Sequence, residues 1–96
     1  MQINLPNRVI RDIRTFAEAN NVKKVVLFGS RARGDNGERS DIDIAVYGGD
    51  FDSFYWDVKE KTHSLLMFDI VQMDAAVAGK LNNEIERDGV VIYEKV

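Results

Sequence analysis

The sequence contains no cysteine, a single histidine and a single proline. Without cysteine there is no disulfide framework, no zinc–thiolate centre and no thiol nucleophile. One histidine, His63, also excludes a metal site built from several imidazoles. No apolar run approaches the ~18 residues of a membrane-spanning helix, and the N-terminal segment MQINLPNRVIRDIR lacks the apolar core of a signal peptide. We therefore expect a soluble cytoplasmic protein with no membrane anchor.

The residues that are present fit one globular domain over 1–96. With 96 residues, 45% of them hydrophobic, the chain can build one core but not two. Its net charge of −3 is unevenly spread, because residues 1–34 carry +5, residues 35–74 carry −7 and residues 75–96 carry −1. The acidic balance argues against direct nucleic-acid binding. The acid-rich middle favours a site for cations.

Hydrophobic spacing and turn residues predict alternating helices and strands. The expected elements are a helix from Pro6 to Asn20, strands over 22–28 and 41–47, a helix over 51–66, a strand over 67–73, a helix through Val77, Leu81 and Ile85, and a strand over 90–93. The arginines of the first helix are expected on its solvated face. This order predicts an α/β (α+β) fold, with two or three layers around a small mixed β-sheet flanked by helices.

The stretch from Gly29 to Val46 carries most of the chemical information. Asp41 and Asp43 are two residues apart on a predicted strand, so their carboxylates point the same way and repel one another. A hard divalent cation such as Mg²⁺, which prefers oxygen ligands and substrate phosphates, would relieve this repulsion. Gly29-Ser30, at the end of the preceding strand, permits close approach of a phosphate and offers a hydroxyl and an N–H.

Other residues complete the predicted site. Asp69 is the one charged residue in the buried-looking run LLMFDIVQM, where an ionised carboxylate is costly unless it is paired or binds metal. Arg31 and Arg33 are alternative phosphate contacts. Ser40 either turns the chain before the strand or lies near the metal. The segment lacks the ligand pattern of an EF-hand and the Gly-Lys-Ser/Thr ending of a P-loop.

A Gly-Ser pair, ten intervening residues, an Asp-x-Asp pair and a later strand aspartate resemble the nucleotidyltransferase superfamily that shares the DNA polymerase β catalytic core. Within it, FGSRARGDNGERSDIDIAV resembles the minimal nucleotidyltransferases, over essentially the whole chain. The resemblance implies a polymerase β palm-like core and attack of a hydroxyl on the α-phosphorus of an NTP, with AMP from ATP as the expected transfer. It implies that Asp41 and Asp43 ligate two Mg²⁺ ions, that Asp69 ligates the catalytic one, and that Gly29 and Ser30 hold the β- and γ-phosphates.

The resemblance also implies a partner. Many minimal nucleotidyltransferases are encoded beside a HEPN-type four-helix-bundle protein, and several such pairs act as antitoxin and toxin, with AMP added to a tyrosine of the partner. A single domain leaves no room for a second one that binds the acceptor, so the expected acceptor is a hydroxyl of a partner protein. A homo-oligomer and a heterotetramer with the partner are both compatible with the sequence.

Two alternatives stay open at this point. The fold could act as a non-catalytic module that only binds its partner, or an oligomer could modify a small-molecule acceptor. Trp56 and His63, seven residues apart on one predicted helix, either edge the core or form a docking surface, for which tryptophan is an efficient anchor.

Overall fold

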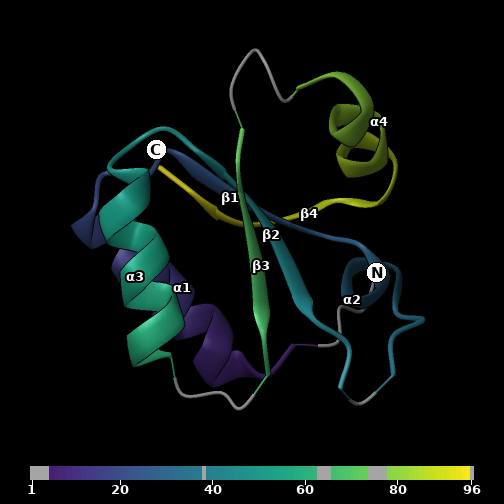
Figure 1. Cartoon of the computed structure of the whole chain (residues 1–96), viewed down its shortest axis with the longest axis horizontal. Helices are drawn as coiled ribbons and strands as arrows, with labels where there is room; N and C mark the ends of the chain where they lie inside the picture. The colour runs from purple at the N-terminus through teal and green to yellow at the C-terminus, as the bar shows by residue number, and fades with distance from the viewer. Residues whose placement is uncertain (1–4, 38, 63–65, 74–77, 96) are drawn as a thin grey trace.

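The computed structural model describes residues 5–37, 39–62, 66–73 and 78–95, with only the backbone for 78–81. Four helices and four strands follow one another within these residues (Figure 1). Their bounds are α1 Asn7–Ala19, β1 Lys24–Phe28, α2 Ser30–Arg33, β2 Ile42–Tyr47, α3 Phe51–Lys61, β3 Phe68–Gln72, α4 Ala78–Asp88 and β4 Val90–Glu94. His63 and Val77 lie outside the described residues.

The strands form one mixed sheet in the order β3-β2-β1-β4. β1 pairs antiparallel with both β2 and β4, whereas β2 and β3 run parallel. A parallel pair needs a crossover connection, and α3 provides it between β2 and β3. The predicted fold class, a small mixed sheet flanked by helices, is confirmed.

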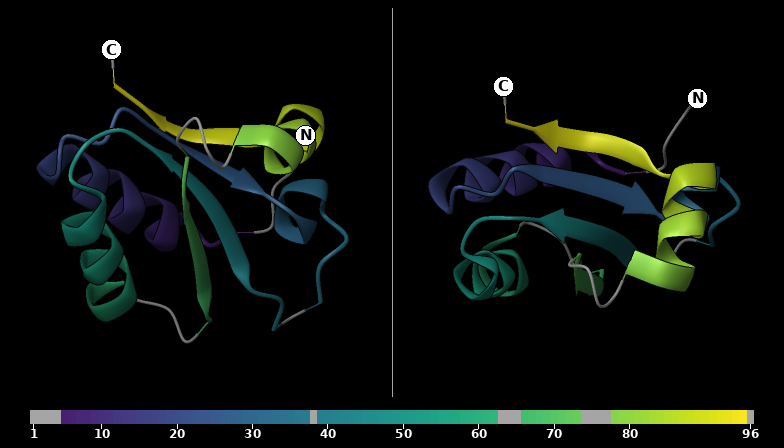
Figure 2. Two further views of the ribbon diagram at one scale, coloured as in Figure 1. Left: turned by 45° about the horizontal axis from the view of Figure 1, so that its top comes forward. Right: turned by 90° about the horizontal axis from the view of Figure 1, so that it is seen from above.

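The two faces of the sheet are covered unequally. α1 and α3 pack side by side on one face (Figure 2) and bury Ile13 and Phe54 against Leu27 and Ile44. On the other face, Ile85 of α4 closes a smaller apolar cluster of Val26, Phe28, Ala45 and Ile85. The strict alternation of β2 therefore buries Ile42, Ile44 and Val46 under the helices and directs Asp43 to the less covered face.

The prediction that the third helix reaches residue 66 is wrong. α3 ends at Lys61, and Thr62 is extended with φ −74° and ψ 137°. The Thr62 hydroxyl donates to the carbonyl oxygen of Val58, which is the acceptor that the next helical N–H would use. The helix therefore ends although the apolar periodicity of the sequence continues, and the Thr62 hydroxyl bonds the carbonyl that is left without its helical partner.

Long basic side chains cover a carbonyl on each edge strand. Arg14 Nε donates to the Ile92 carbonyl oxygen of β4 at 2.7 Å, so this arginine is not simply solvated as its position in the sequence predicts. Lys59 Nζ donates to the Phe68 carbonyl oxygen of β3 at 2.5 Å. Each contact joins a helix to a carbonyl oxygen of an edge strand. Among the described residues, no helix is long and apolar enough to cross a membrane.

Candidate active site

The site begins at the turn that follows β1. Gly29 has φ +75° and ψ −156°, a region that essentially only glycine occupies. The short helix α2 starts at Ser30 and closes at Gly34, which is left-handed and donates its N–H to the Ser30 carbonyl oxygen at 2.8 Å. This tight reversal places the Ser30 N–H and hydroxyl at the end of the strand, as the sequence predicts.

Asp43 lies directly against this turn. Phe28 and Asp43 are register partners across β1 and β2, so Gly29 comes beside the Asp43 side chain. A Cβ added at Gly29 would overlap the Asp43 carboxylate oxygen Oδ2. Glycine is therefore needed at position 29 for two reasons, its backbone conformation and the space that the carboxylate occupies.

The three predicted acidic residues lie on neighbouring strands. Asp43 of β2 and Asp69 of β3 are register partners in the parallel pair. Asp41 immediately precedes β2, two residues before Asp43, and therefore shares its side of the strand. Asp41 and Asp69 are exposed and Asp43 is half-buried. The carboxylates thus gather on the open face of the sheet, at the end marked by Gly29.

The electrostatics of this cluster are unfavourable without a cation. Burial, the largest cause, and the negative charges of Asp69, Asp41 and Glu84 together raise the pKa of Asp43 from 3.8 to about 6. The positive charge of Arg33 opposes the shift. Oxygen-rich clusters of this kind suit Mg²⁺. In the part of the chain that the structure describes, no group of three or more His, Cys, Asp or Glu side chains is placed to hold a metal ion. The case for Mg²⁺ rests instead on the register of Asp43 with Asp69 and on the oxygen atoms that these carboxylates offer.

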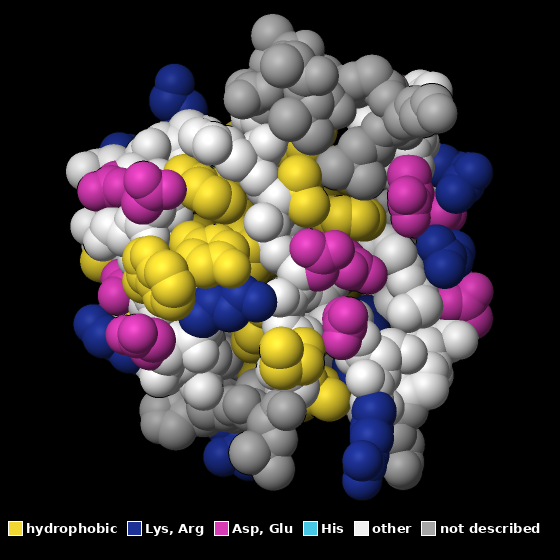
Figure 3. All heavy atoms as spheres, viewed as in Figure 1, with side chains coloured by type: hydrophobic (Ala, Val, Ile, Leu, Met, Phe, Trp, Pro, Cys, Tyr) yellow, Lys and Arg dark blue, Asp and Glu magenta, His cyan; other side chains and the backbone are white. Residues whose placement is uncertain are grey.

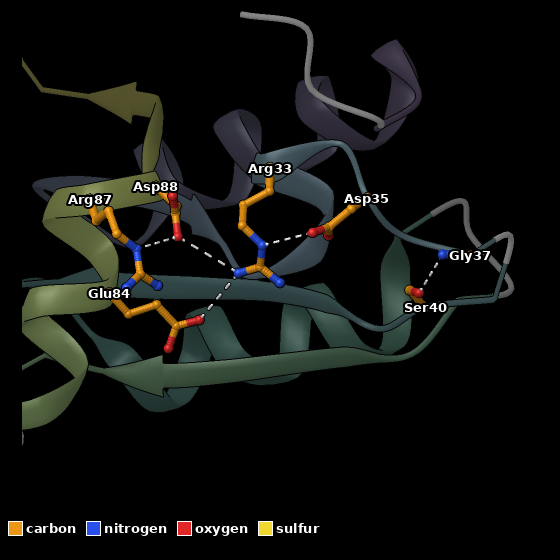
Figure 4. A network of polar contacts seen from close by, with 7 residues as sticks. All are labelled: Arg33, Asp35, Gly37, Ser40, Glu84, Arg87 and Asp88. Atoms are coloured by element: carbon orange, nitrogen blue, oxygen red, sulfur yellow. Dashed lines mark hydrogen bonds and ion pairs between the residues drawn. The ribbon is translucent and has the colours of Figure 1, made fainter.

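The two candidate arginines occupy different environments. Arg31 is buried, at 3% exposed, and its Nε donates to the Ser40 carbonyl oxygen at 3.0 Å. Arg33 is exposed, and its guanidinium lies 3.1 Å from Asp35, 3.7 Å from Asp88 and 3.8 Å from Glu84. Figure 4 shows Arg33 between α2 and α4 with these three carboxylates around it. A phosphate can reach Arg33 more readily than Arg31.

Ser40 has a local partner. Its hydroxyl oxygen accepts the Gly37 N–H at 2.9 Å, which closes the turn between α2 and β2 (Figure 4). This contact matches the prediction of a turn residue, and a role near the metal stays a prediction.

Arg31 is expected to hold the chain around Ser40, just before β2, in place. Replacement of Arg31 by Met removes its bond to the Ser40 carbonyl and should lower the free energy of unfolding by about 2 kcal/mol. Chemical denaturation would measure this loss. Arg39→Met, at an exposed position of the same loop, serves as the control and should change stability by less than about 0.5 kcal/mol. Equal effects of the two substitutions would contradict this role of Arg31.

Sequence reasoning missed Glu84. It lies on α4, and its charge acts on the pKa of Asp43 while its carboxylate faces Arg33. In the sequence Glu84 is one of several charged residues on a polar helix face. Its distance along the chain from Asp43 does not indicate that the two residues lie close together. Only the packing of Ile85 against the second face of the sheet brings Glu84 to the site.

Comparison with known families agrees with this arrangement. Residues 11–96 match the family model described as polymerase beta, nucleotidyltransferase. The chain therefore belongs to the polymerase β-type nucleotidyltransferase family, and the predicted family is confirmed.

Individual proteins and solved structures that resemble this chain are adenylyltransferase-like or come from toxin–antitoxin complexes. A candidate protein adenylyltransferase of Methanocaldococcus jannaschii is 62% identical over 32 residues, which are 32% of each chain. The match thus spans about a third of that relative. A chain of a toxin–antitoxin complex with AMP-PNP is 25% identical, with a TM-score of 0.70 over 90% of this chain and 73% of that one. A chain from the complex of the tri-AMPylated Shewanella oneidensis HEPN toxin with its MNT antitoxin is 23% identical, with a TM-score of 0.61 over 90% and 70% of the two chains, and shares the fold.

Proposed function

We propose that this protein, acting as a single domain, transfers AMP from ATP to a hydroxyl group of a partner protein. The observation that carries this proposal is the register of Asp43 with Asp69, with the Gly29 turn closed against Asp43. This arrangement puts two carboxylates and a phosphate-binding turn on one face. The family match and the AMP-PNP complex of a structural neighbour support a nucleotide as the substrate.

Each residue of the site has a separate role in the reaction. The Ser30 N–H and hydroxyl bind the β- and γ-phosphates, which approach closely because residue 29 has no side chain. Asp41 and Asp43 would hold Mg²⁺, two ions being expected, and Asp69 would hold only the catalytic one. When bound, Mg²⁺ supplies positive charge that offsets the charge developing on the entering and leaving oxygens. Asp69 orients the acceptor hydroxyl and takes up its proton as the oxygen attacks the α-phosphorus. The bond from the α-phosphorus to the oxygen that bridges to the β-phosphate breaks, and pyrophosphate leaves.

Arg33 provides the remaining positive charge. Three carboxylates surround it, and a bound triphosphate offers oxygens of higher charge density. We assign Arg33, rather than Arg31, as the phosphate contact, because the Arg31 Nε donates to the Ser40 carbonyl below the surface.

The acceptor is proposed to be a HEPN-type helical protein. Among the structural neighbours are a chain of a toxin–antitoxin complex and a chain from a complex with an AMPylated HEPN toxin. By this likeness the present chain is the antitoxin of such a pair and modifies its partner. The reaction takes place in the cytoplasm, within a hetero-oligomer of the two proteins.

Calorimetric titration tests the nucleotide site. The purified chain should bind a non-hydrolysable ATP analogue in the presence of Mg²⁺, and binding should be lost in the double variant Asp41→Asn, Asp43→Asn. Asp52→Asn, at an exposed position of α3, is the matched control and should bind as the wild type does. Metal-independent binding, or equal binding by the double variant, would overturn the assignment.

A further inference from the structure

An aromatic surface lies on α3 beside the edge strand β3. Trp56 is 58% exposed and Met67, just before β3, is 66% exposed. Phe51 and Tyr55 are half-buried on the same helix as Trp56 and pack against the core. We call these four residues the α3–β3 surface. Single exposed apolar side chains are common, but two large ones on elements that Lys59 joins indicate an interaction site.

The α3–β3 surface is ordered by contacts within the chain. The Tyr55 and Trp56 rings meet edge to face with centroids 5.2 Å apart, and the Phe51 and Tyr55 centroids are 6.0 Å apart. The Lys59 ammonium lies 5.4 Å from the Tyr55 ring centroid and also donates to the Phe68 carbonyl oxygen. Lys59 thereby ties the aromatic rings of α3 to the edge of β3. A surface fixed in this way loses little entropy when it binds.

This surface adjoins the acidic residues of the site. The carbonyl oxygen of Met67 accepts the N–H of Ile42, the first residue of β2. Met67 therefore lies beside the start of β2, next to Asp41. Met67 and Asp69 are two residues apart and share one side of β3. Figure 3 shows hydrophobic side chains gathered over α3 and acidic side chains next to them over the strands. The apolar surface and the carboxylates therefore face the same direction.

From this continuity we propose that the α3–β3 surface is where the acceptor protein docks, with an apolar side chain against Trp56 and basic side chains around its acceptor hydroxyl. The inference rests on the proposed function, because Asp69 marks where the hydroxyl must arrive. Asp69 is on an edge strand, so the acceptor segment reaches it across that edge, over Met67.

Charge complementarity sets the chemistry of the acceptor protein. Residues 35–74, which include Asp41, Asp43 and Asp69, carry a net charge of −7. A partner with acidic residues around its acceptor would be repelled, whereas basic residues would speed association and fix its orientation. The apolar contact with Trp56 supplies affinity, since buried tryptophans are frequent hot spots of binding.

The chain contains one tryptophan, so 5-fluorotryptophan labelling gives a single fluorine resonance that reports on Trp56. The unlabelled HEPN-type protein proposed as the partner is the probe. Its addition should shift the resonance, and a rise in salt from ~50 to ~500 mM should weaken binding. Trp56→Ala and Met67→Ala should each weaken the complex about tenfold. Both variants should still bind the ATP analogue with Mg²⁺.

Val91→Ala is the control, because Val91 is 50% exposed on β4 at the opposite edge of the sheet. It should bind the partner as the wild type does. An unshifted Trp56 resonance in the complex, partner affinity unchanged by both substitutions, or binding insensitive to salt would each overturn the proposal. Failure of the wild type to bind the nucleotide would instead overturn the proposed function.

Discussion

Replacement of Asp43 by Asn should reduce AMP transfer about a thousandfold and, at the same time, make the protein more stable at neutral pH. The loss of activity follows because Asp43 has the most central position of the three carboxylates, beside Gly29 and in register with Asp69. An amide cannot balance the charge of a bound cation, and a thousandfold corresponds to about 4 kcal/mol of transition-state stabilisation. Steady-state transfer assays would measure this loss.

The gain in stability follows from the raised pKa of Asp43. Burial and the nearby carboxylates lift this pKa from 3.8 to about 6, so the ionised form opposes folding. The cost develops as the pH rises above 3.8 and is complete above about 6. After allowance for solvent screening, Asp43→Asn should add about 1 kcal/mol at pH 7, or about 5 °C in Tm. Below pH ~4 the two proteins should melt alike.

Asp35→Asn is the control for this prediction. Asp35 is exposed and pairs with Arg33 on the surface, so its substitution should change Tm by no more than about 2 °C. A lower Tm of Asp43→Asn at pH 7 without metal would contradict the account of the cluster.

Gly29→Ala should abolish nucleotide binding and lower the free energy of unfolding by about 3 kcal/mol. The backbone at position 29 has φ +75° and ψ −156°, which costs ~1–3 kcal/mol for alanine. The new methyl group also overlaps Asp43 Oδ2, and crowding of this kind costs ~1–3 kcal/mol. Thermal melting should show a Tm lower by about 15 °C. Calorimetry with the ATP analogue should show no binding, because the Asp43 carboxylate must move.

Gly37→Ala provides a matched substitution in the same region. A Cβ at Gly37 would meet only the Ser40 hydroxyl, at an ordinary 3.7 Å. This variant should melt within about 2 °C of the wild type and bind the analogue normally. If Gly29→Ala behaved like Gly37→Ala, neither the strain nor the close approach at Gly29 would matter for the site.

Local patterns in the sequence predict much of the fold. The alternation of Ile42, Ile44 and Val46 with Asp43 correctly predicts which side of β2 is buried. This signal has the period of the strand itself, so a single sequence contains it. The prediction that Asp69 lies in a buried strand is wrong, because Asp69 is exposed on the edge strand β3. Its register with Asp43 comes from the pairing of β2 with β3, which no local pattern contains.

Features that depend on contacts between distant residues were not predictable. Arg31 and Arg33 look alike in the sequence, yet Arg31 is buried and Arg33 is exposed. Glu84 reaches the site only because α4 packs on the second face of the sheet. α3 ends at Lys61 although the apolar spacing of the sequence continues to residue 66.

One measurement tests the central claim most directly. The purified chain and its HEPN-type partner should be incubated with Mg²⁺ and ATP labelled either at the α- or at the γ-phosphate. We predict that the partner acquires the α-label, that the γ-label leaves as pyrophosphate, and that the partner gains the mass of AMP in mass spectrometry. Incorporation of the γ-label instead, or an unmodified partner in a mixture where the chain binds both nucleotide and partner, would contradict nucleotidyl transfer by this site.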